Sequence, residues 1–219
     1  MVIAIDGPAG SGKSTTAKNV AEKLGFIHIN TGAMYRGIAL KCIQKDVNIE
    51  NSTELKHLLA NTKFNFGKEG GETPFMDGVD ISAEIISAQV TDFVSQVSAI
   101  SEVRDKLVQY QRKMAEGLNV VLEGRDIGTV VFPNADHKLF LVADIHERVM
   151  RRKKEMEAKG EVVSLEELTA EMLERDRKDS TRKHSPLKKT EDAVEIDTTG
   201  ISIEEQVNRI VEIVNKTIK

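Results

Sequence analysis

The chain has 219 residues, of which 40% are hydrophobic and 30% are charged, so it is long enough for one large domain with a buried core. No apolar run approaches the roughly 20 residues of a membrane span, and no basic and apolar leader precedes the first predicted strand, so we expect neither a membrane protein nor a secreted one. A net charge of −4 and an aromatic content of 4% argue against a protein that binds nucleic-acid polymers. The single cysteine, Cys42, cannot form an internal disulfide, which favours a cytoplasmic protein.

The first predicted strand leads into a glycine-rich motif. Residues 2–5 are a short apolar run that predicts a buried strand, and residues 14–24 repeat apolar side chains at helical spacing. Residues 7–14 read GPAGSGKS and fit the pattern Gly-x4-Gly-Lys-Ser/Thr. Strand, glycine loop and helix together predict a P-loop, in which main-chain amides and the helix N-terminus bind the phosphates of a nucleoside triphosphate. Lys13 is expected to reach the β- and γ-phosphates, and the Ser14 hydroxyl to hold Mg²⁺.

The rest of the chain alternates predicted strands and helices. Short apolar runs predict strands at residues 26–29, 119–123, 138–143 and 193–196. Helical spacing predicts helices at residues 30–45, 53–61, 85–100, 103–116, 148–159, 164–179 and 202–216. Ser164 and Glu167 match a capping box at the start of one of these helices. Strands that alternate with helices in this way predict a three-layer α/β sandwich with a five-stranded parallel sheet.

One segment interrupts this alternation. Residues 63–66, 74–77 and 79–81 are short runs typical of strands, and they are separated by tight turns and by a break at Gly70-Gly71. We therefore predict a small antiparallel sheet inserted near residues 63–82.

Arginine residues gather after the predicted strands, where a parallel α/β sheet binds its ligands. Arg36 and Arg125 each follow a strand, and residues 148–189 contain thirteen Lys/Arg against nine Asp/Glu. Because a guanidinium group pairs with two phosphate oxygens at once, we expect a second anion site that faces the P-loop. The charged helix after the strand at residues 138–143 carries three more arginines: Arg148, Arg151 and Arg152.

Four segments together resemble the bacterial cytidylate kinases. They are residues 7–14, residues 31–36 (TGAMYR), residues 123–133 (EGRDIGTVVFP) and residues 174–182 (ERDRKDSTR). The third segment is very specific, whereas the P-loop alone would indicate only nucleotide binding. The resemblance covers essentially the whole chain, and the insertion resembles the extra small sheet that bacterial members carry in their monophosphate-binding region.

The resemblance implies that ATP, with Mg²⁺, phosphorylates CMP and dCMP, and it assigns roles residue by residue. Asp126 would accept a hydrogen bond from the cytosine amino group, and Arg104 would donate to its carbonyl and ring nitrogen, a polarity that disfavours uracil. ATP would contact Gly7, Pro8, Ala9, Gly10, Ser11, Gly12, Lys13, Ser14 and Thr15. The monophosphate, base and sugar would further contact Thr31, where the family often has serine, and Arg36, Ser95, Arg125, Arg175, Asp179 and Arg182. Charge neutralisation during transfer would come from Lys13, Arg125, Arg148, Arg152 and Arg182.

The same resemblance implies one kinase unit built from three parts. A core would comprise residues 1–30, 101–144 and 180–219, a monophosphate-binding region about residues 31–100, and a lid about residues 145–163. Asp6, just before the P-loop, is expected to help fix that loop. We expect a monomer that binds small substrates, with neither a nucleic-acid polymer nor a membrane as partner.

Two alternatives stay open on the sequence. Another P-loop kinase, acting on UMP, AMP or shikimate, would share the first motif. A regulatory GTPase has one point of support, because residues 197–200 read DTTG and match Asp-x-x-Gly. The guanine-reading Asn-Lys-x-Asp is missing after it, since Asn215-Lys216 is followed by Thr217-Ile218.

Overall fold

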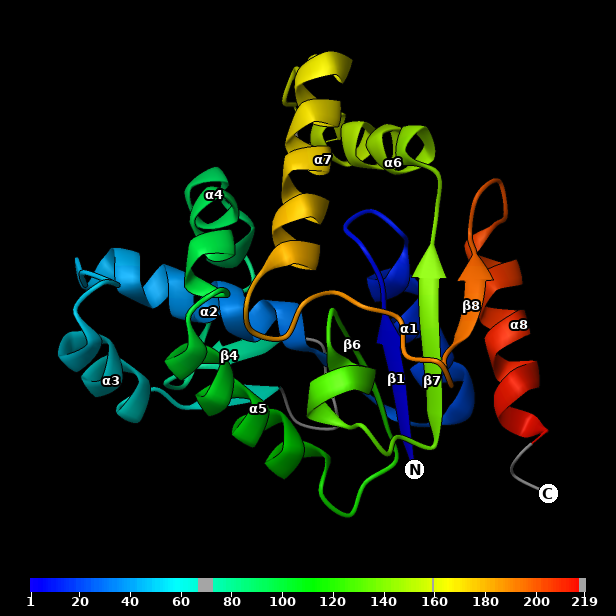
Figure 1. Ribbon diagram of the computed structural model, residues 1–219, viewed down its shortest axis with the longest axis horizontal. Coiled ribbons are helices and arrows are strands. Elements are labelled where there is room, and N and C mark those ends of the chain that lie inside the picture. Colours follow the sequence, from blue (N-terminus) through cyan, green and yellow to red (C-terminus); the bar gives the residue numbers. More distant parts are fainter. Residues whose placement is uncertain (67–72, 159, 217–219) are drawn as a thin grey trace.

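A parallel sheet of five strands forms the centre of the molecule, in the order β2-β6-β1-β7-β8 (Figure 1). The computed structural model describes residues 1–66, 73–158 and 160–216. The central strand is buried along nearly its whole length, as expected of the apolar runs that predicted these strands. The strands are β1 Val2–Asp6, β2 Ile27–Asn30, β6 Val120–Gly124, β7 His137–Val142 and β8 Val194–Asp197.

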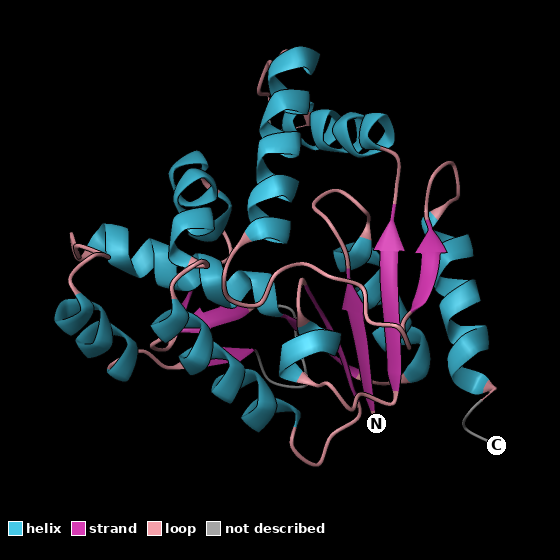
Figure 2. Cartoon of the chain, viewed as in Figure 1, coloured by secondary structure: helices cyan, strands magenta, loops and turns pink. Residues whose placement is uncertain are grey.

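Helices cover both faces of this sheet, which confirms the predicted three-layer architecture (Figure 2). Ile3 and Ile5 of β1 pack with residues of α1 (Lys13–Leu24) and α8 (Ile203–Asn215). Ala4, which points to the other face, packs with residues of α2 (Thr31–Gln44) and α5 (Ser101–Ala115). The alternation along β1 therefore separates two apolar cores.

The predicted insertion is also present, as a second sheet of three antiparallel strands in the order β3-β4-β5. Its strands are Phe64–Phe66, Pro74–Met76 and Val79–Asp80, and α3 (Ser52–Ala60) precedes them. Phe64 lies so close to Gly37 of α2 that a Cβ atom at position 37 would come within 2.7 Å of its ring. A glycine at that position thus lets the insertion pack tightly on α2. The predicted break at Gly70-Gly71 lies outside the described residues.

The prediction of one helical stretch over residues 85–100 is wrong in one respect. The structure has a short 3-10 helix, Glu84–Ile86, and then a separate helix α4, Ala88–Val97. Ser87 stands between them with extended backbone angles, and its side chain accepts a hydrogen bond from the amide of Val90. A serine in this position favours the start of a new helix over the continuation of the old one.

Helices α6 (Ile145–Glu157) and α7 (Leu165–Thr181) stand beyond the carboxyl end of β7 (Figure 1). They share a small apolar cluster of Val149, Leu168 and Met172, apart from the two cores that flank the sheet. The predicted cap is confirmed, since the Ser164 side chain accepts a hydrogen bond from the amide of Glu167. The boundaries differ from the prediction by two or three residues. Helix α6 begins three residues earlier because Asp144 caps it, and α7 continues two residues further, to Thr181.

Candidate active site

The loop between β1 and α1 turns back on itself through three glycines with positive φ angles. Gly7, Gly10 and Gly12 have φ of 156°, 73° and 84°. A Cβ atom at Gly7 would lie 2.3 Å from the carbonyl oxygen of Leu141, so no larger residue fits there. These conformations and this close approach require glycine, which explains the motif physically.

Lys13 begins α1 and is almost completely buried. Its Nζ atom donates to the carbonyl of Pro8 at 3.0 Å. Burial, helped by the nearby positive charge of Arg125, lowers the pKa of Lys13 to about 7. A triphosphate against this amine would favour its charged form, so ATP binding and protonation of Lys13 are expected to be coupled.

This coupling predicts proton uptake when ATP binds above pH 7. The amine is largely neutral at pH 8 in this structure, because its pKa of about 7 lies below that pH, and the phosphates would draw a proton onto it. Calorimetry of ATP binding at pH 8 in buffers of different ionisation enthalpy should show an uptake of close to one proton. The variant Lys13→Met is the control and should show none. Equal binding heats in all buffers for the parent protein would contradict the prediction.

The Ser14 hydroxyl, expected to hold Mg²⁺, donates to Oε1 of Glu123 at 2.8 Å. Glu123 lies on β6, beside β1 in the sheet, and is buried. A hydroxyl and a carboxylate side by side are hard oxygen ligands of the kind that Mg²⁺ takes, together with water and phosphate oxygens. The residues present therefore fit the ion. Sequence reasoning missed Glu123 in this role, although a carboxylate that ends a buried strand was a usable signal.

Asp6 ends β1, and its carboxylate accepts hydrogen bonds from the amides of Ile127 and Gly128, both at 2.8 Å. The expectation that Asp6 fixes the P-loop therefore needs correction, because the bonds go to the loop that carries Arg125 and Asp126. Burial raises the pKa of Asp6 to about 6, against the two amides that favour its ionised form. Asp6 thus links the end of β1, where the P-loop begins, to the loop that carries Arg125 and Asp126.

A pH-dependent contribution to stability follows from Asp6. Its pKa is about 6 in the folded chain and 3.8 in the reference state, so its contribution is fully present below pH 3.8 and is lost as the pH rises through 6. The free energy of unfolding of the parent protein, minus that of Asp6→Asn, should therefore fall by about 2 kcal/mol between pH 4 and pH 7. Urea unfolding at a series of pH values measures this difference. A flat difference would contradict the assignment.

Guanidinium groups converge beside the P-loop, at the carboxyl ends of β2 and β6. Arg36 donates to the carbonyl of Ile85 and to the hydroxyl of Thr91, both at 2.9 Å. Burial, together with the charges of Arg175, Arg152 and Arg125, lowers the pKa of Arg36 to about 10. Charges of one sign this close together form a strong site for an anion.

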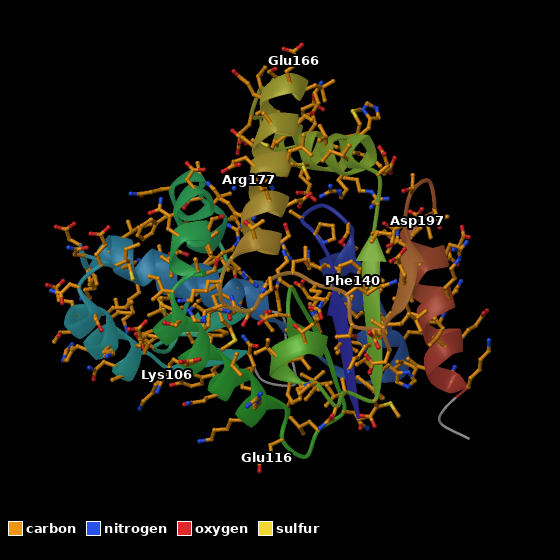
Figure 3. All side chains as sticks on the ribbon, in the orientation of Figure 1. Lys106, Glu116, Phe140, Glu166, Arg177 and Asp197 are labelled. Carbon is orange, nitrogen blue, oxygen red and sulfur yellow. The ribbon has the colours of Figure 1, made fainter. Side chains whose placement is uncertain are left out.

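The acidic residue expected near the sugar lies inside this cluster. Asp179 is buried, and Nε of Arg125 donates to its carboxylate at 2.8 Å. Nε of Arg175 is buried without a partner among the described residues. Arg177, in contrast, is exposed on α7 and pairs with Glu174 at 2.8 Å (Figure 3). The cluster therefore includes Arg175 and Asp179 of the predicted segment and excludes its most exposed arginine.

Arg104 and Asp126, the expected base-reading pair, form a buried ion pair. Nη1 of Arg104 also donates to the carbonyl of Ser98 at 3.0 Å, and the guanidinium lies 5.1 Å from the ring centre of Tyr35. Arg182 lies 3.8 Å from the other carboxylate oxygen of Asp126. The face of an aromatic ring attracts a cation, so Tyr35 helps orient Arg104. Sequence reasoning missed Tyr35, since one aromatic residue in an apolar helix carries no signal of its own.

The structure does not test the roles expected of three other site residues. The hydroxyl of Thr31 donates to the carbonyl of Glu123 at 2.7 Å and is buried, so it holds the main chain. Ser95 is half-buried on α4, where its carbonyl accepts a hydrogen bond from Ser98 at 3.2 Å. Thr15 is exposed on the first turn of α1. The roles proposed for these side chains stay predictions.

The predicted lid arginines are held by protein groups. Arg148 donates to the carbonyls of Ala143 and Ala9, both at 3.1 Å, and pairs with Asp176 at 2.7 Å. Arg152 pairs with Glu155 at 3.2 Å on the helix surface. Neither arrangement tests a catalytic role, but Arg148 would have to exchange several contacts to reach a phosphoryl group.

Known proteins are similar to this chain over nearly its whole length. The model of the family described as cytidylate kinase matches residues 3–216. The chain belongs to the cytidylate kinase family. A relative named cytidylate kinase from Caldanaerobacter subterraneus subsp. tengcongensis is 48% identical over 217 residues, which cover 99% of this chain and 96% of the relative. Another cytidylate kinase, from Desulforamulus reducens, is 49% identical over 214 residues, which cover 98% of this chain and 96% of the relative.

Solved structures outside the family support the fold. A gluconokinase from Sinorhizobium meliloti matches with a TM-score of 0.51 at 13% identity, covering 98% of this chain and 95% of its own. A shikimate kinase from Bacteroides thetaiotaomicron matches with a TM-score of 0.50 at 13% identity, covering 98% of each chain. This chain thus shares its architecture with these two kinases. Within the described ranges, no helix is long and apolar enough to cross a membrane.

Proposed function

We propose that this protein transfers the γ-phosphoryl group of ATP to CMP or dCMP, giving ADP and CDP or dCDP. The proposal rests on one observation, that three groups lie side by side at one edge of the sheet. They are the P-loop with Lys13, the guanidinium cluster around Arg36 and Arg125, and the Arg104–Asp126 pair. Such a site can bind a triphosphate, a second phosphate and a base with an amino group.

The chemistry needs little beyond positioning and charge neutralisation. The attacking oxygen of CMP belongs to a phosphate that is already ionised, so no general base is required. Arg36, Arg125 and Arg182 would hold this phosphate, while Lys13 would neutralise charge on the phosphates of ATP. When bound, Mg²⁺ would neutralise charge on the phosphates of ATP, and Ser14 and Glu123 are the residues that would hold it.

The geometry also supports contacts to the base and to the sugar of the nucleoside. The carboxylate of Asp126 would accept from the cytosine amino group, and Arg104 would donate to the carbonyl and ring nitrogen. Ser95, Arg175 and Asp179 would surround the sugar. We further propose that residues 145–163 act as a lid and that residues 31–100 close on the monophosphate. We infer a cytoplasmic monomer, in keeping with a buried free thiol at Cys42.

The test is a coupled assay of ADP release with ATP·Mg²⁺ and a panel of CMP, dCMP, UMP, AMP and shikimate. CMP or dCMP should be used with a kcat/KM at least about tenfold higher than that of any other acceptor. A tenfold preference for UMP or AMP would overturn the base assignment. Tight GTP binding without transfer to CMP would instead favour a regulatory GTPase.

A further inference from the structure

The carbonyl oxygens of three consecutive P-loop residues each accept a hydrogen bond from a side chain that reaches the loop from outside it. Nη1 of Arg148 donates to Ala9 at 3.1 Å, and Nη1 of Arg151 donates to Gly10 at 3.4 Å. The hydroxyl of Thr198 donates to the carbonyl of Ser11 at 3.0 Å. We call these three side chains the carbonyl brace.

The brace has a direct effect on phosphate binding. Within one trans peptide unit the C=O and the N–H point in opposite directions. When the carbonyls of residues 9 to 11 are held outward, the amides that follow them are turned the other way, into the loop. A P-loop binds phosphate through such inward amides, so the brace pre-organises the phosphate site.

Thr198 is the buried centre of this arrangement. It follows β8, next to Asp197 at the carboxyl end of that strand (Figure 3), and its exposed fraction is 0%. Its amide donates to the carbonyl of Val142 at 2.8 Å, and its hydroxyl is shared between that carbonyl at 2.9 Å and Ser11. Its own carbonyl accepts from Nη2 of Arg151 at 2.6 Å, and its hydroxyl contacts Nη1 at 3.2 Å. One residue therefore ties β7, the P-loop and α6 together.

We propose that Thr198 is a positioning residue of the phosphate site, which sets the affinity for the triphosphate through the Ser11 carbonyl and Arg151. The inference rests on the proposed function only in that the triphosphate is ATP. It also gives a role to residues 197–200, whose DTTG sequence resembles a GTPase motif. In this chain the first threonine of that sequence, Thr198, holds the P-loop through its hydrogen bond to the carbonyl of Ser11.

The deciding experiment compares Thr198→Val with Thr198→Ser. Valine keeps the volume and branching of threonine and removes the hydroxyl, so the Kd for ATP·Mg²⁺ by calorimetry and the KM for ATP should each rise about tenfold. Serine keeps the hydroxyl and should stay within about threefold of the parent protein. The KM for CMP should change by less than about twofold in both variants, since Thr198 contacts Ser11, Val142 and Arg151, which lie outside the guanidinium cluster. Thr198→Ala gives the same comparison if the valine variant does not fold.

The matched control is Thr62→Val. The Thr62 hydroxyl is equally buried and donates to the carbonyl of Leu58 at 2.6 Å, but it lies at the end of α3, away from the P-loop. This variant should lose stability in thermal unfolding without a change in the Kd for ATP. If Thr198→Val loses stability but binds ATP like the parent protein, the residue is merely structural and the inference is overturned. A parent protein that binds ATP but does not phosphorylate CMP would overturn the proposed function and leave the ATP-binding comparison valid.

Discussion

Replacement of Lys13 by alanine is expected to lower the turnover of CMP by roughly three orders of magnitude. The Lys13 amine is buried at the start of α1 and touches the carbonyl of Pro8 within the P-loop. A charge held there acts in a site shielded from water, where its interaction with phosphate is much stronger than at the surface. Steady-state assays with ATP·Mg²⁺ and CMP measure the loss.

The control for this variant lies on the same helix. Lys23→Ala removes an exposed lysine that donates to Asn208 at 2.6 Å, and its turnover should stay within about twofold of the parent value. Circular dichroism and the midpoint of thermal unfolding should show that Lys13→Ala is folded. Near-normal turnover of a folded Lys13→Ala protein would reject the phosphate role of the P-loop.

Replacement of Asp126 by asparagine is expected to have the second large effect, which is on the selectivity for CMP over UMP. The amide keeps the shape of the side chain but can donate a hydrogen bond where the carboxylate only accepts, so it suits the carbonyl of uracil better than the amino group of cytosine. The kcat/KM for CMP should fall about 100-fold, and the preference for CMP over UMP should fall at least about tenfold. The KM for ATP should change by less than about twofold.

The control for this second variant is Asp105→Asn, an exposed position that follows Arg104 on α5. It should leave the kcat/KM values for both nucleotides close to those of the parent protein. An equal loss with CMP and UMP in Asp126→Asn would mean that Asp126 supports the fold of the loop and does not read the base. Initial rates with the two acceptors at saturating ATP decide between these outcomes.

The parts of the site that the sequence predicted well are those set by local geometry. The P-loop could be found because its glycines need positive φ angles and its neighbours have strand and helix periodicity. The start of α7 could be found because Ser164 and Glu167 lie three residues apart within one helical turn. The split at Ser87 was missed because apolar spacing continues across it, although serine itself favours a helix start.

The contacts that the sequence could not supply join residues far apart in the chain. Ser14 and Glu123 are separated by 109 positions, and Thr198 and Ser11 by 187 positions. Whether such side chains meet depends on strand order and register, which are properties of the whole sheet. The same holds for Arg148, because helical spacing places it on α6 but does not show that its guanidinium reaches the carbonyl of Ala9, 139 positions away.

The separate apolar cluster of α6 and α7 has a consequence for the proposed opening of the lid. Three buried side chains, Val149, Leu168 and Met172, hold these two helices together, whereas the sheet is flanked by two far larger cores. Swinging the pair outward would break polar contacts such as those of Arg148 and Arg151 but would leave both large cores covered. We therefore propose that the helical pair behaves as a cooperative unit of its own, with a free energy of opening well below that of global unfolding, which would let nucleotides enter and leave at little cost to the rest of the molecule.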